Sequence, residues 1–139
     1  MYNKNLKAYK ANSLQADMLV ADSHRVIQLM MQGLLERLAQ AKGAIDRHDY
    51  EAKANYVSKS IALINGLQDS LDLSYGKIPE DLFALYDYMK GRVMDASRNM
   101  DNAPIDEVAN LLITIKSAWD SIPDHEKEKA FSVQSTKNE

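Results

Sequence analysis

The chain has 139 residues, about the length of one domain, and contains no cysteine, which excludes disulfides, thiolate chemistry and the usual structural zinc sites. Its 17 basic and 20 acidic residues are interspersed, giving a formal net charge of -3, so we expect no nucleic-acid partner. No apolar run approaches the roughly 20 residues of a membrane span, and the polar start lacks a secretory core, so we expect a cytoplasmic protein without membrane insertion.

Residues 1–22 precede the first predicted helix. They contain more apolar side chains than a solvated tail needs, among them Leu6, Tyr9, Met18 and Leu19. We therefore expect this segment to be a docked but mobile N-terminal arm.

A first helix is predicted from Ser23, a good N-cap residue, to about residue 47. Its polar residues form one narrow stripe, namely Arg25, Gln28, Gln32, Glu36 and Gln40. Apolar residues fill the rest of the circumference, which is more than the single apolar face that a surface helix usually needs. Either this helix is surrounded by other helices, or part of its surface binds a partner.

A second helix is predicted over residues 50–73, with Asp49 as its N-cap. One row of its residues is expected to face the core, namely Ala54, Val57, Ile61, Ile64 and Leu71. A second row beside it is partly apolar, namely Tyr56, Ser60, Leu63 and Leu67. This helix therefore also has more apolar surface than one face requires.

Prolines and one glycine mark the remaining boundaries. The helical pattern breaks at Gly76. Because proline suits the first turn of a helix, Pro79 predicts a third helix over 79–99 and Pro104 a fourth over 104–122. Residues 123–139 are polar and charged and predict a flexible C-terminal tail. Short connections favour antiparallel neighbours, so the predicted fold is all-α: an antiparallel up-down-up-down four-helix bundle over residues 23–122.

The residues that carry enzyme or metal chemistry are scarce. No glutamate has a histidine three residues later, as a di-metal carboxylate bundle requires. The three histidines, His24, His48 and His125, lie near predicted helix ends or in the tail, where we expect them to be solvated. A phosphotransfer bundle needs an exposed histidine within a helix, and none is predicted. We therefore expect no catalytic residue, no metal and no cofactor.

Three segments carry a resemblance to a known family. LYDYMKGRVMDA, residues 85–96, matches the third-helix pattern of the flagellar export chaperone FliS family, with valine where leucine is common. IDEVANLLITIKSAWDSI, residues 105–122, resembles that family's fourth helix, and residues 21–72 resemble its first two helices and the acidic turn between them. The similarity runs from residue 9 to about residue 122, with the three segments in the family's order.

The resemblance implies a cytoplasmic secretion chaperone and not an enzyme. Similar proteins bind the C-terminal segment of flagellin, which is disordered in the monomer, prevent its premature polymerisation, and deliver it to the flagellar type III export apparatus. Tyr9 matches the tyrosine of the family's N-terminal arm, which is expected to occupy part of the client site when that site is empty.

The apolar surface and the resemblance together suggest a client-binding groove between the second and third helices. Its expected members are Tyr56, Leu63, Leu67, Leu85 and Tyr88, with Leu6 and Tyr9 of the arm covering it. For each groove residue, ordinary packing inside the bundle is the alternative. In the third helix, helical geometry places Tyr86 in the core and Tyr88 on the opposite side.

A rival hypothesis assigns the same apolar face to self-association. The protein would then be a dimeric helical-bundle adaptor or regulatory protein.

Overall fold

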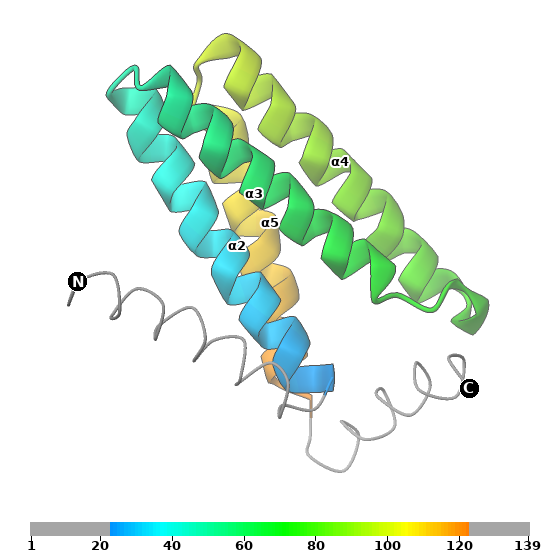
Figure 1. Ribbon diagram of the computed structural model, residues 1–139. Helices are drawn as coiled ribbons and strands as arrows, with labels where there is room; N and C mark the ends of the chain where they lie inside the picture. Colours follow the sequence, from blue (N-terminus) through cyan, green and yellow to red (C-terminus); the bar gives the residue numbers. More distant parts are fainter. Residues whose placement is uncertain (1–22, 123–139) are drawn as a thin grey trace, which may run out of the picture.

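The structure is a computed structural model, and it describes residues 23–122. Within this range the chain forms helices and one 3-10 turn and no strand. The elements are α2 (Ser23–Asp46), α3 (Tyr50–Asp69), η1 (Leu73–Tyr75), α4 (Lys77–Asn99) and α5 (Ala103–Asp120). The helices alternate in direction along the bundle (Figure 1), which confirms the predicted all-α, up-down-up-down class. The predicted arm, 1–22, and tail, 123–139, lie outside the described residues.

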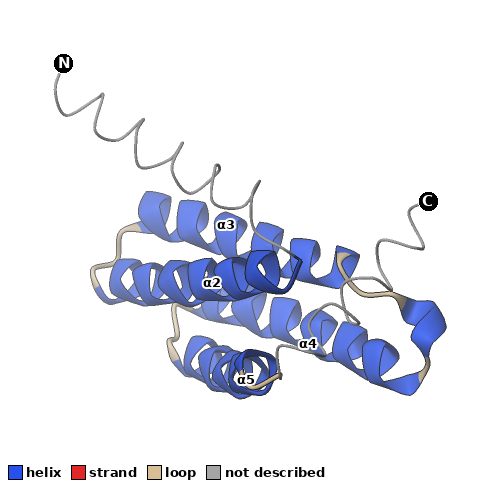
Figure 2. Cartoon of the chain, turned by 90° about the horizontal axis from the view of Figure 1, so that it is seen from below, coloured by secondary structure: helices blue, strands red, loops and turns tan. Residues whose placement is uncertain are grey.

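Each helix packs against two neighbours, because α3 and α5 each contact both α2 and α4. Short loops join consecutive helices (Figure 2). Between α2 and α3, the Asp49 side chain accepts a hydrogen bond from the Ala52 amide at 3.1 Å, as expected for an N-cap. Pro104 lies in the first turn of α5, where its missing amide hydrogen costs nothing.

The core is built from the apolar stripes of all the described helices. Its fully buried large side chains are Met31, Leu34, Leu38, Ile64, Leu67, Met89, Val93, Ile105, Val108 and Leu112. Tyr86 also lies in this core and is only 2% exposed, as predicted. Burial raises the pKa of its phenol to about 12, because the charged phenolate is poorly solvated there.

The buried stripe of α3 is rotated from the predicted one. Val57 and Ile64 are buried as expected, but Ala54 is exposed, and Ser60 and Leu67 of the second row are buried instead. Ser60 tolerates this position because its hydroxyl donates to the Tyr56 carbonyl at 2.9 Å. The buried stripe therefore combines members of both predicted rows.

The connection between α3 and α4 is ordered by short polar side chains. α3 ends at Asp69 rather than near residue 73, and the hydroxyl of its C-cap residue Ser70 donates to the Leu67 carbonyl at 2.6 Å, which satisfies one of the last carbonyls of the helix. The Asp72 carboxylate then accepts hydrogen bonds from the amide and hydroxyl of Ser74, at 3.0 and 2.6 Å, and caps η1. Gly76 follows with φ of 101°, a conformation that glycine adopts readily.

The expectation that His24 is solvated is wrong. His24 is 3% exposed, and its Nε2 donates to the Trp119 carbonyl at 2.8 Å. The Trp119 indole donates in return to the His24 carbonyl at 3.0 Å, and the two rings stack with centroids 4.8 Å apart. These contacts join the first turn of α2 to the last turn of α5. Because the two residues are far apart in the sequence, the residues beside His24 do not indicate that it is buried. His48 is exposed, and His125 lies outside the described residues.

Candidate partner-binding surface

The expected groove residues lie on two seams of the bundle and not on one. Leu63 faces α2, since a β-carbon added at Gly33 would lie 3.7 Å from its Cδ1. Tyr88 instead faces α5, where its hydroxyl is hydrogen-bonded to Glu107. The expectation of one groove lined by both residues is therefore wrong, although their roles in binding stay predictions.

The other expected members are placed as follows. Tyr56 and Leu85 are half-buried at the edge of the core. Leu67 is 1% exposed and belongs to the core itself. Leu6 and Tyr9 lie outside the described residues.

Polar contacts cross the seam between α3 and α4. The Gln68 amide, only 5% exposed, donates to the Phe83 carbonyl at 3.0 Å and to the Asp87 carboxylate at 2.8 Å. Lys90 donates to the Asn65 side chain at 2.9 Å. The hydrogen bond from Gln68, followed by that from Lys90, lowers the pKa of Asp87.

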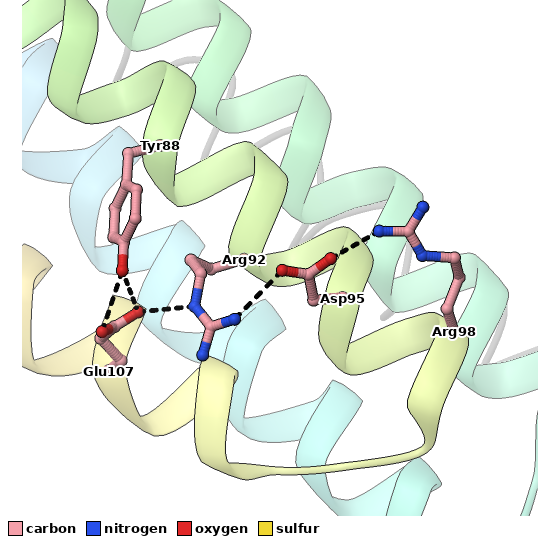
Figure 3. A network of polar contacts seen from close by, with 5 residues as sticks. All are labelled: Tyr88, Arg92, Asp95, Arg98 and Glu107. Atoms are coloured by element: carbon pink, nitrogen blue, oxygen red, sulfur yellow. Dashed lines mark hydrogen bonds and ion pairs between the residues drawn. The ribbon is translucent and has the colours of Figure 1, made fainter.

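The seam between α4 and α5 carries a network of polar contacts (Figure 3). The Tyr88 hydroxyl donates to both carboxylate oxygens of Glu107, at 2.9 and 3.1 Å. Arg92 donates from Nε to Glu107 at 2.8 Å and from Nη1 to Asp95 at 3.0 Å. Arg98 in turn pairs with Asp95. The network links α4 to α5 through Glu107, beside the Tyr88 ring.

Electrostatics within this network follow from the hydrogen bonds. Arg92 and then Tyr88, both donating to Glu107, lower the pKa of that carboxyl. The hydrogen bond to Glu107 also raises the pKa of the Tyr88 phenol, because ionisation would remove the donated proton. At physiological pH Glu107 is charged and Tyr88 neutral even at their ordinary pKa values, and the two shifts widen the pH range over which this charged hydrogen bond persists.

Several large apolar side chains remain exposed around the bundle. They are Tyr50, Leu73, Tyr75, Ile78, Tyr88, Met94 and Ile113. Three of these, Leu73, Tyr75 and Ile78, lie close together in sequence on η1 and the first turn of α4, with Ile78 76% exposed. Single exposed apolar residues are ordinary, but clusters of them mark interaction surfaces. The sequence predicts only a helix break here, although the apolar residues on both sides of Gly76 are a signal for this surface.

Neither metal nor membrane features accompany this surface. Among residues 23–122, no group of three or more histidine and acidic side chains could hold a metal ion. In the same range, no helix combines the length and apolar character that a membrane span needs.

Comparisons with known proteins agree with the resemblance noted in the sequence. The family model described as "Flagellar protein FliS" matches residues 4–126. A flagellar secretion chaperone FliSB of Pseudomonas aeruginosa is 42% identical over 120 residues, covering 86% of this chain and 95% of that protein. Flagellar secretion chaperones FliS of Vibrio cholerae and Salmonella typhimurium are 33% and 35% identical, covering 86% and 84% of this chain and 88% of each relative.

Proposed function

Since this chain belongs to the FliS family of flagellar proteins, in which its relatives are named flagellar secretion chaperones, we propose a more specific role for it. The protein is a cytoplasmic chaperone that binds the disordered C-terminal segment of flagellin. It prevents premature polymerisation of flagellin and delivers it to the flagellar type III export apparatus. Family membership is the observation that carries this proposal.

The exposed apolar side chains of the bundle support binding of a flexible client. A disordered segment loses conformational entropy when it binds, so the complex needs a large apolar contact, on the order of 1,000 Å² or more. A client that wraps around the bundle reaches both the α2–α3 seam and the α4–α5 seam, and so gains the required area.

This arrangement gives the expected residues separate tasks. Tyr88 and Leu85 contact the client on α4, while Tyr56 and Leu63 contact it on the other seam. Leu67 packs in the core beneath Tyr56 and Leu63.

The N-terminal arm has a different task. Leu6 and Tyr9 cover apolar surface when no client is bound, which limits aggregation and lowers the apparent client affinity by competition.

Light scattering with and without a C-terminal flagellin peptide tests the proposal. The expected result is a complex of one chaperone and one peptide. A scrambled peptide of the same composition is the control and should not bind. A constitutive dimer that ignores the flagellin peptide would contradict the proposal and favour the dimeric adaptor instead.

A further inference from the structure

Tyr88 has an exposed ring and a fixed hydroxyl. Its side chain is 48% exposed, yet its hydroxyl is held by both oxygens of Glu107, at 2.9 and 3.1 Å. An exposed side chain without such a bond samples several rotamers and loses that freedom when a partner binds. The hydrogen bond to Glu107 restrains Tyr88 in one orientation before a partner binds.

Glu107 can hold Tyr88 because Glu107 is itself held. The Nε of Arg92 donates to Glu107 at 2.8 Å, and the other side of Arg92 is bound to Asp95. Arg92 lies one helical turn after Tyr88 on α4, so the tyrosine and the arginine reach the same carboxylate from one helix face (Figure 3).

The charges of this network cancel, since Arg92 and Arg98 face Glu107 and Asp95. On α5, the exposed residues between Glu107 and Asp120 are all uncharged, namely Asn110, Ile113, Thr114, Ser117 and Ala118. Asn110 and Thr114 follow Glu107 at helical spacing and therefore share its face. In that stretch α5 therefore exposes no charge to a partner, whereas on α4 the exposed Asp81 lies two turns before Tyr88 on the same helix face.

We infer that Glu107 is a positioning residue that orients Tyr88 for the client, and that the client side chain packing on the Tyr88 ring is apolar. This inference rests on the proposed function. It assigns the binding contact to the Tyr88 ring and the preorganisation to Glu107 and Arg92.

Titration of the full-length protein with a C-terminal flagellin peptide tests the inference. Glu107→Ala and Tyr88→Phe should each weaken binding roughly three- to tenfold, because the ring must then be ordered on binding. Glu107→Gln keeps an acceptor for the hydroxyl and should stay within about twofold of the wild type.

Asp106→Ala is the matched control. Asp106 is the neighbouring residue of α5, but it pairs with Lys42 of α2 and not with Tyr88. Its loss removes a comparable surface ion pair, so it should leave peptide affinity unchanged. Added salt should change the loss of affinity caused by Tyr88→Phe by less than about twofold, because an apolar contact with the Tyr88 ring is little affected by screening.

The possible failures are distinguishable. If Asp106→Ala and Glu107→Ala weakened peptide binding equally, the network would only stabilise the bundle, and the inference would be overturned. Wild-type affinity of both Glu107→Ala and Tyr88→Phe would also overturn it, whether or not Tyr88→Ala binds weakly. No binding of the peptide by the wild-type protein would contradict the proposed function itself.

Discussion

His24→Ala should destabilise the bundle measurably, although histidine at this position reads in the sequence as a solvated residue. The substitution removes a hydrogen bond to the Trp119 carbonyl, worth about 1 kcal/mol, and a ring stack worth about 0.5–1.5 kcal/mol. The hydrogen bond from the indole to the backbone of residue 24 remains available. The expected loss is therefore about 2 kcal/mol in the free energy of unfolding, or roughly 10 °C in Tm for a domain of this size.

Thermal and urea denaturation followed by circular dichroism would measure this loss. His48→Asn is the control: His48 is exposed with φ of 56°, a conformation that asparagine tolerates, so its change should be within about 0.5 kcal/mol. If His24→Ala were no more destabilising than His48→Asn, the contact between the ends of α2 and α5 would contribute nothing, and the reasoning from its geometry would be refuted.

Three further outcomes are expected. The pKa of Tyr86 is raised from 10.0 to about 12, so the stability from its neutral phenol is present below pH 10 and is lost as the pH rises toward 12. Tyr86→Phe has no phenol to ionise and should escape this loss. Between neutral pH and pH 12, urea denaturation should therefore show the free energy of unfolding of the wild type falling by about 2 kcal/mol more than that of Tyr86→Phe. The pKa of Glu107 is lowered from 4.5, so the stability from its charged carboxylate is present above pH 4.5 and is lost as the pH falls through the lowered value. Glu107→Gln should therefore lose less free energy of unfolding between neutral and acidic pH than the wild type. An equally steep loss would contradict a stabilising role of the Glu107 charge. Deleting residues 1–12 should tighten client binding or leave it unchanged while lowering solubility, and complete loss of binding would make the arm part of the site.

The helices follow from signals that act locally. Asp49 caps α3, and Pro104 lies in the first turn of α5, and both effects depend on the backbone within a few residues. The division between Tyr86 and Tyr88 is equally local, because helical geometry alone separates the two rings. The structure confirms it, with Tyr86 2% and Tyr88 48% exposed.

What the sequence could not provide depends on contacts between distant segments. Trp119 contacts His24 only once the bundle has formed. Likewise, Glu107 of α5 contacts Tyr88 only when α5 packs against α4. The single groove failed for the same reason: periodicity assigns a residue to a face of its own helix but does not say which neighbour covers that face. Leu63 was therefore assigned correctly to the second row of α3 and incorrectly to the seam with α4.

A pull-down with full-length flagellin and with flagellin lacking its C-terminal segment tests the central claim most directly. The chaperone account predicts that this protein retains the full-length flagellin and does not retain the truncated one. Equal retention of both forms, or of neither, would contradict it.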